Sequence, residues 1–156
     1  MSKTTPATLA LDRAGVAYSL ATYAYDPNAE RVGLQAAEAL AVPPGEVLKT
    51  LMVLADGKPA CVVLASDREV GMKKLAAALG AKAAEMMKPA DAERITGYRV
   101  GGVSPFGQKR AVRTVLDADA AELPSAFVNA GQRGLQARLA PADLARVLDA
   151  VVAAVT

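Results

Sequence analysis

The sequence predicts a single α/β domain with a mixed, curved β-sheet surrounded by helices, and three observations support this prediction. Segments with the alternation of strands and segments with helical periodicity follow one another without strict alternation. Near the middle of the chain, Asp56-Gly57 separates two apolar segments, residues 47–55 and 59–65, and predicts a hairpin. The 156 residues suit one hydrophobic core, and neither an internal repeat nor a long linker divides them. We therefore expect one domain over residues 1–156.

The N-terminal part of the chain is expected to contain two helices and one strand. Thr4-Thr5-Pro6 is typical of a helix start, because Thr can cap the first turn and Pro is tolerated within it. Residues 16–23 alternate and predict a strand. A turn signal at 26–28 precedes a short helix at 34–40, which consists of strong helix formers.

The segment after the hairpin is expected to contain two helices, a short element and a long loop. Residues 72–79 and 89–95 predict helices, each ended by a glycine. Residues 82–86 are expected to form a short strand. Residues 98–108 contain three glycines and a proline, which predicts a loop.

The last third of the chain is expected to complete the sheet and to end in a helix. Residues 111–116, 125–129 and 135–139 are strand-like, with a tight turn at 131–134. Residues 141–155 predict the best helix of the chain, because Pro and Asp stand in its first turn and apolar residues recur at helical spacing. This apolar stripe consists of Leu144, Val147, Leu148, Val151, Val152 and Val155.

The composition excludes several kinds of chemistry. The chain has no histidine and one cysteine, Cys61, which excludes Ser-His-Asp and Cys-His catalysis, a disulfide within the chain and a thiolate zinc site. We expect neither a metal nor a cofactor, and Cys61 lies in an apolar run as a small core residue would. The net charge of +2 permits a small contact with a phosphate backbone but does not require one. No apolar run reaches the length of a membrane span and no signal peptide is evident, so a cytoplasmic location without membrane contact is expected.

Lys49 is the first candidate functional residue, because it stands in a strand-like segment among apolar neighbours. In a strand it shares its face with Leu51 and Val53, which favour burial. One interpretation is a lysine that extends to water at a strand end and pairs with Glu46. The other is a lysine at the mouth of a cleft that binds a phosphate or polarises a carbonyl oxygen, with the Thr50 hydroxyl beside it.

Two glycine-containing segments are the other candidates. Residues 101–105 could form a backbone concavity that binds an anion, or a tight surface turn. Lys109, Arg110 and Arg113 follow, and they could contact phosphates or form a solvated edge. Residues 129–134 are typical of a hairpin turn with glycines at positive φ.

Four segments together resemble the YbaK-type aminoacyl-tRNA deacylases, which are relatives of the editing domain inserted in bacterial prolyl-tRNA synthetases. They are TYAYDP from residue 22, LKTLMV from 48, GYRVGGVSPFGQKR from 97 and VNAGQRGLQARLAPADLARVL from 128. The resemblance extends from about Val16 to the last predicted helix. It implies hydrolysis of the ester between a wrong amino acid and proline tRNA, and the group resembled most is the Cys-tRNA(Pro) deacylases. Mischarged proline tRNA and prolyl-tRNA synthetase are the expected partners.

The resemblance also implies a set of site residues. The functional lysine of the family falls on Lys49 and its glycine loop on residues 101–105, so the expected catalytic residues are Lys49 and Gly101. The expected substrate-binding residues are Tyr23, Val32, Thr50, Gly102, Val103, Ser104, Pro105, Asn129, Gly131 and Gln136.

The resemblance leaves the substrate open, because the chain differs from the family pattern at Val32, Asn129 and Gln136. A cysteine substrate would react through its own thiol and form a cyclic thiolactone. Alanine or another small amino acid on tRNA is the alternative substrate. A non-catalytic module that binds tRNA or a synthetase is the alternative function.

Overall fold

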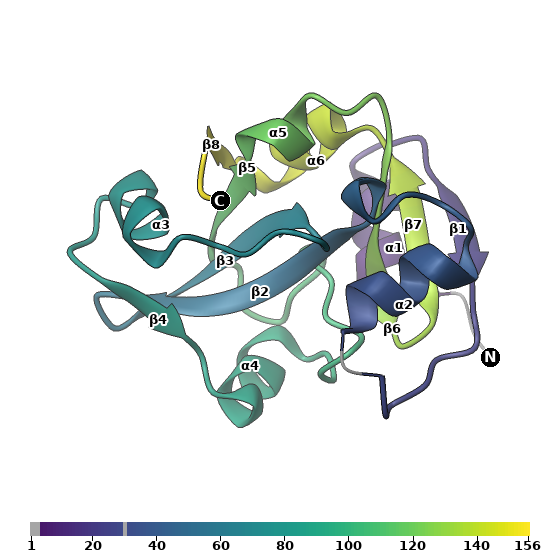
Figure 1. The fold of residues 1–156 in the computed structure, drawn as a ribbon, viewed down its shortest axis with the longest axis horizontal. Helices are drawn as coiled ribbons and strands as arrows, with labels where there is room; N and C mark the ends of the chain where they lie inside the picture. The colour runs from purple at the N-terminus through teal and green to yellow at the C-terminus, as the bar shows by residue number, and fades with distance from the viewer. Residues whose placement is uncertain (1–3, 30) are drawn as a thin grey trace.

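The computed structural model describes residues 4–29 and 31–156, in which two β-sheets form the centre of the molecule and helices lie around them (Figure 1). The larger sheet has the strand order β4-β2-β3-β5-β8, and the smaller has the order β1-β7-β6. The α/β class and the mixed sheet are therefore as predicted. The division into two sheets was not predicted, because sequence periodicity carries no information on which strands pair.

The β-hairpin of β2 (Leu48–Ala55) and β3 (Lys58–Ala65) is the centre of the larger sheet. The two strands pair from Leu48 opposite Ala65 to Ala55 opposite Lys58. Asp56 and Gly57 both have positive φ, at 49° and 78°, as the tight turns that match strand twist require. The turn thus fixes the register of the hairpin, in which Lys49 lies opposite Leu64.

The remaining strands of the larger sheet make it mixed. β4 (Ala84–Met86) pairs antiparallel with β2. β5 (Arg113–Asp117) and β8 (Val151–Ala153) add parallel strands beyond β3. The sheet therefore begins at β4 with an antiparallel edge and ends at β8 with a parallel one.

The smaller sheet is antiparallel and lies beside the start of β2. It consists of β1 (Ser19–Thr22), β6 (Ala126–Gln132) and β7 (Leu135–Leu139). A parallel bridge between Val47 and Phe127 joins the two sheets immediately before β2. Residues of β2 and residues of β6 and β7 can therefore line one pocket.

The helices cover both faces of the β2–β3 hairpin. Val62 and Leu64 pack with Leu75 in one hydrophobic cluster, whereas Cys61 and Val63 belong to a second cluster on the other face. This alternation follows from the period of two along a strand. The helices are α1 (Pro6–Arg13), α2 (Val32–Ala39), η1 (Pro44–Glu46), α3 (Met72–Ala78), α4 (Pro89–Thr96), α5 (Ala118–Ala121) and α6 (Pro141–Leu148). None of those in the described part of the chain is long and apolar enough to span a membrane.

The prediction of one helix over residues 141–155 is wrong. α6 ends at Leu148, Asp149 adopts the left-handed conformation with φ 49°, and β8 follows. Val151 and Val152, expected in the apolar stripe, are exposed and pair in register with β5 instead. β-branched residues favour strands, and the open edge of β5 supplies the partner that helical periodicity could not reveal.

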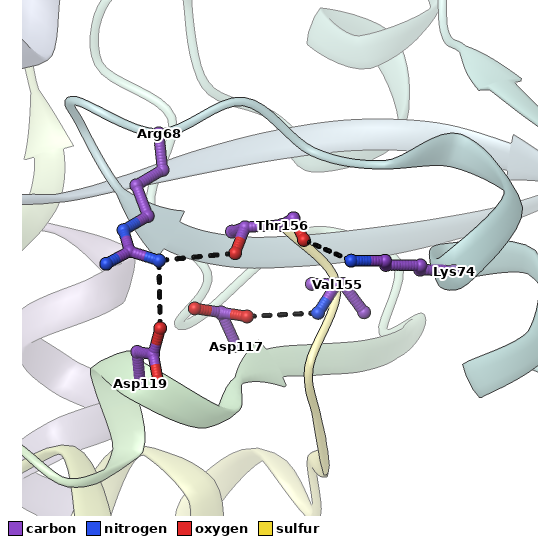
Figure 2. A network of polar contacts seen from close by, with 6 residues as sticks. All are labelled: Arg68, Lys74, Asp117, Asp119, Val155 and Thr156. Carbon is purple, nitrogen blue, oxygen red and sulfur yellow. Dashed lines mark hydrogen bonds and ion pairs between the residues drawn. The ribbon is translucent and has the colours of Figure 1, made fainter.

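Polar contacts fasten the segment after β8 (Figure 2). The N–H of Val155 donates to Asp117 Oδ1 at 3.0 Å, and Lys74 Nζ donates to the carbonyl oxygen of Thr156 at 2.7 Å. Arg68 reaches the Thr156 hydroxyl at 3.5 Å and forms an ion pair with Asp119 at 2.9 Å. This end of the chain is thus held between β5, α3 and the segment that precedes α3.

Candidate functional site

A pocket of about 370 Å³ lies where β2 meets the smaller sheet. Residues 47–52, at the start of β2, line one part of it. Met86, Met87 and Pro89 line another part, and Asn129 and Gln136 of β6 and β7 line a third. The pocket thus combines side chains from both sheets, which the bridge between Val47 and Phe127 holds together.

Lys49 is partly buried in this pocket and makes no ion pair with any of the described residues. The pairing with Glu46 that one interpretation proposed is therefore not what the structure shows. Burial lowers the pKa of Lys49, and the positive charge of Arg31 lowers it further. The negative charges of Glu69 and Asp67 oppose these two effects. Lys49 is a cation whose charge no side chain in the described structure directly neutralises.

Asn129 and Gln136 lie opposite each other on β6 and β7, and both are buried. Asn129 is fully engaged, since its Nδ2 donates to the carbonyl oxygens of Gly101 at 3.3 Å and Gln132 at 3.0 Å. Its Oδ1 accepts from the N–H of Gly131 at 2.6 Å. The register of β6 shifts between Asn129 and Gln132. Asn129 thus connects the glycine loop, residues 101–105, to this irregular end of β6.

Three buried polar atoms near the pocket have no hydrogen-bond partner among the described residues. They are Thr50 Oγ1, Gln136 Oε1 and the Tyr23 hydroxyl. Thr50 and Gln136 line the pocket, and the Gln136 side chain is close enough to oppose the rise in the pKa of Tyr23 that burial causes. A buried polar group without a partner costs about 1–3 kcal/mol, so these atoms are suited to meet a polar ligand or ordered water.

The glycine loop packs directly against the turn between β6 and β7. A Cβ atom added to Gly102 would lie 2.8 Å from the backbone nitrogen of Arg133, so glycine is required for this close approach. Gly101 has φ 92°, and a side chain there would collide with the Tyr25 hydroxyl. The two glycine segments that the sequence singled out are therefore in contact.

The loop offers fewer backbone donors to a ligand than expected. The N–H of Gly102 donates to the carbonyl oxygen of Arg99 at 2.8 Å, so it is not free for the anion-binding concavity that residues 101–105 could form. Ser104 is fully buried, and its hydroxyl accepts from the N–H of Phe106 at 3.2 Å. Gly101 and Val103 are the members of residues 101–105 that line the pocket.

Several expected site residues support the pocket without lining it. Pro105 is buried, and Gly131 has φ 96° and packs against Tyr98 and Thr5. Tyr23 is near Gln136 but does not line the pocket, and its N–H donates to the carbonyl oxygen of Gly134 at 2.9 Å. Val32 begins α2, but its side chain lies outside the part that the structure describes.

Sequence reasoning missed Arg31, Ser66, Met86 and Val100, which also line the pocket. Arg31 Nη2 donates to the carbonyl oxygen of Ser66 at 3.4 Å. Met86 and Val100 are large apolar side chains that are 50% and 43% exposed. No local pattern marks these residues, because tertiary structure alone brings them to Lys49.

Cys61 lies in the core, as predicted. Burial raises the pKa of its thiol to about 12, so the thiol stays protonated near neutral pH. Within the described residues, no three His, Cys, Asp or Glu side chains gather where they could hold a metal ion.

Comparison with known proteins identifies related sequences over most of this chain. The family model described as "Aminoacyl-tRNA editing domain" matches residues 26–147. EbsC of Enterococcus faecalis, provisionally named a Cys-tRNA(Pro)/Cys-tRNA(Cys) deacylase, is 36% identical over 121 residues. That match covers 77% of this chain and 74% of EbsC. A proline–tRNA ligase of Streptococcus suis is 29% identical over 108 residues, which are 69% of this chain but 17% of the ligase.

Solved structures share the fold. The crystal structure of hypothetical protein APE2540 superposes with a TM-score of 0.84 at 24% identity, covering 97% of this chain and 99% of that one. A second protein, provisionally described as a trans-editing enzyme for prolyl-tRNA synthetase, gives a TM-score of 0.81 at 21% identity and covers 99% of both chains. At these identities, the two structures support the architecture alone.

Proposed function

The chain belongs to the aminoacyl-tRNA editing domain family, and on this basis we propose that it hydrolyses mischarged Cys-tRNA(Pro) in trans. The observation that carries the proposal is the place of Lys49, which is partly buried in the pocket and has no ion pair among the described residues. Such a cation is suited to hold the phosphate or carbonyl oxygen of an aminoacylated tRNA end. The names of EbsC, a provisional Cys-tRNA(Pro)/Cys-tRNA(Cys) deacylase, and of the proline–tRNA ligases support proline tRNA as the substrate that we propose.

The pocket is large enough for an aminoacyl group with part of its terminal nucleoside. Its volume of about 370 Å³ falls at the lower end of the range for small-ligand sites. In our proposal, Lys49 fixes the nucleotide end, and the N–H groups of Gly101 and Val103 face the ester carbonyl. The buried polar atoms of Thr50 and Gln136 then meet the amino-acid part.

The reaction that we propose needs no protein nucleophile. An aminoacyl ester is already activated, so stabilising charge at its carbonyl is the main requirement. The cysteine sulfur of the substrate attacks its own carbonyl carbon, a C–S bond forms, and the C–O bond to the tRNA breaks. The thiol proton passes to the departing 3′ oxygen of the tRNA, and water later opens the cyclic thiolactone. The protein supplies orientation, which is a proximity effect.

The test is single-turnover deacylation of Cys-tRNA(Pro) with the wild type and Lys49→Ala. We expect Lys49→Ala to slow the reaction by about 10²-fold or more, because the charge that positions the aminoacyl end is lost. Arg146→Ala is the matched control, since Arg146 is an exposed cation of α6 that does not line the pocket. A Lys49→Ala rate equal to that of the wild type would remove the role assigned to Lys49.

Two further measurements test the chemistry. Cys61→Ala should retain activity, and its loss in a folded variant would refute a mechanism without a protein thiol. A panel of Cys-, Ser- and Ala-tRNA(Pro) should show a preference for cysteine, because serine and alanine lack the attacking thiol. Faster hydrolysis of Ala-tRNA(Pro) would instead favour the alanine deacylase.

We further propose that the protein acts together with prolyl-tRNA synthetase. The net charge of +2 supports only weak tRNA binding by this chain alone. The expected result is that the synthetase raises the apparent affinity for tRNA, measured by fluorescence titration at fixed salt. An affinity that the synthetase does not change would contradict this partnership.

A further inference from the structure

Arg31 and Lys49 reach the same pocket from different parts of the chain. Arg31 directly precedes α2, whereas Lys49 is the second residue of β2. Both line the pocket, and the charge of Arg31 lowers the pKa of Lys49, so the two cations are close enough to repel each other. Two like charges at one pocket are unfavourable unless an anion lies between them.

The guanidinium of Arg31 is available to a ligand. Its Nη2 donates to the carbonyl oxygen of Ser66 over a long 3.4 Å. That bond leaves most of the donors of the guanidinium fork unused within the described structure. Arg31 also forms no ion pair with any carboxylate in the described ranges.

The acids nearby do not neutralise the pair. Asp67 and Glu69 follow Ser66 and are exposed, and each of them has a smaller effect on the pKa of Lys49 than Arg31 has. Neither acid is within ion-pair distance of Arg31 or Lys49 in the described residues. Arg68, between them, is already paired with Asp119. Arg31 and Lys49 line the pocket, whereas Asp67 and Glu69 do not, so the charged side chains of this wall are both positive.

We propose that Arg31 is a second phosphate-binding residue, which together with Lys49 holds the 5′-phosphate of the terminal nucleotide that carries the amino acid. This inference rests on the proposed function, because it takes the ligand to be an aminoacylated nucleotide. The guanidinium presents paired N–H groups to two phosphate oxygens, while Lys49 acts as a point charge. The apolar side chains of Met86 in β4 and Val100 in the loop after α4 remain for the sugar and base.

The test compares AMP with adenosine in NMR titrations, because the two probes differ only in the phosphate. The wild type should bind AMP about tenfold or more tightly than adenosine, as charge-assisted hydrogen bonds allow. Arg31→Ala should remove most of this advantage, Arg31→Lys should keep part of it, and Arg146→Ala should keep all of it. Equal binding of AMP and adenosine by the wild type, or an unchanged ratio in Arg31→Ala, would overturn the proposal.

Kinetics then connect this phosphate site to the reaction. In Arg31→Ala, KM for the aminoacyl-tRNA should rise while kcat stays close to the wild-type value, because Arg31 touches the phosphate and not the ester. The slope of the logarithm of the association constant against the logarithm of the salt concentration should become less steep by about 0.7, the value for one phosphate contact with a single strand. A loss confined to kcat would count against phosphate binding.

The two proposals can fail separately. The AMP and adenosine titrations need no turnover, so a protein that discriminates between the two probes but deacylates no tRNA would refute the proposed function alone. If the Arg31→Ala variant deacylates Cys-tRNA(Pro) with the same KM and kcat as the wild type, only the role of Arg31 is refuted. Thermal unfolding of each variant verifies that the fold is retained.

Discussion

The charge of Lys49 is set by neighbours that are distant in sequence. Burial disfavours the ammonium form, Arg31 repels it, and Glu69 stabilises it. Lys49 is thus a partly buried ammonium group whose positive charge an anionic ligand would stabilise. Binding a phosphate should raise the pKa of Lys49, just as a carboxylate would.

The pKa of Lys49 provides the first prediction, measured by NMR on the labelled side chain. The wild-type value should lie below 10.5, and Arg31→Ala should raise it because a repelling charge is removed. Glu69→Gln should lower it, because an attracting charge is removed. Since the unfolded chain binds more protons than the folded one between the two pKa values, stability should increase as pH rises through that window. A lower pKa of Lys49 in the Arg31→Ala variant would contradict the repulsion between the two cations. Arg146→Ala is the control and should leave the pKa of Lys49 unchanged.

The second prediction concerns the buried hydroxyl of Thr50, which has no partner among the described residues. Thr50→Val should keep or raise the free energy of unfolding by up to about 1 kcal/mol, because it removes an unsatisfied group of nearly the same shape. It should also slow deacylation if the substrate uses this hydroxyl. Thr96→Val is the matched control, since the Thr96 hydroxyl donates to the carbonyl oxygen of Ala92 at 2.7 Å. That variant should lose about 1 kcal/mol in denaturant unfolding, and equal losses in both variants would refute the distinction.

At the scale of elements, the contact between the glycine loop and the β6–β7 turn determines the shape of the pocket. Gly102 approaches the backbone of Arg133, and Arg133 Nε donates to the carbonyl oxygen of Val100 at 2.9 Å. The Arg133 guanidinium also lies over the Tyr25 ring, 5.3 Å from its centroid. Backbone packing at Gly102 and the side-chain contacts of Arg133 therefore both hold the glycine loop against the β6–β7 turn.

The third prediction tests this contact with Gly102→Ala. The added Cβ would lie 2.8 Å from the Arg133 nitrogen, so the loop must move away from the turn. We expect a loss of about 1–3 kcal/mol in denaturant unfolding and slower deacylation, because Gly101 moves with the loop. Gly45→Ala meets no atom within 4 Å and should be close to neutral. Wild-type stability and activity in Gly102→Ala would show that the loop tolerates the shift.

Element boundaries also show what the sequence can and cannot predict. The hairpin turn at Asp56-Gly57 could be predicted because its signal is local, and the structure confirms it. The segment from Val151 to Ala153 was predicted as helix because its valines fit a helical stripe, but the edge of β5 draws it into a strand. Lys49 could be singled out from its own strand, whereas Arg31 could not, since only the fold brings it to the pocket.

At the scale of the whole molecule, the end of the chain closes the larger sheet at a distance from the pocket. Asp117 is buried and accepts from the N–H of Val155, and the N–H of Gly71 donates to the carbonyl oxygen of Val155 at 2.6 Å. These bonds connect β5, the segment after β8 and the residue before α3, and Figure 2 shows the bond between Asp117 and Val155. None of these three residues lines the pocket. These hydrogen bonds at the end of the chain should therefore contribute to the stability of the fold but not to catalysis.

The fourth prediction follows from this separation. Asp117→Ala should lower the free energy of unfolding by about 1–3 kcal/mol, because a buried N–H loses its acceptor. Hydrogen exchange at Val155 should become faster, while deacylation below the unfolding temperature should match the wild type. Asp119→Ala removes an exposed ion pair with Arg68 and should change stability by less than about 1 kcal/mol. Impaired deacylation in a folded Asp117→Ala variant would show that the end of the chain communicates with the pocket.

The junction of two sheets has a consequence for how such proteins can diversify. Lys49 belongs to the larger sheet and Ser66, which anchors Arg31, directly follows strand β3 of that sheet, whereas Asn129 and Gln136 belong to the smaller one. On our proposals, Lys49 and Arg31 bind the phosphate common to every tRNA end, whereas β7 contributes Gln136 to the contacts with the amino acid, which differs between substrates. Substitutions confined to β6 and β7 could then redirect a descendant of this chain to another misacylated substrate while it inherits the same nucleotide anchor.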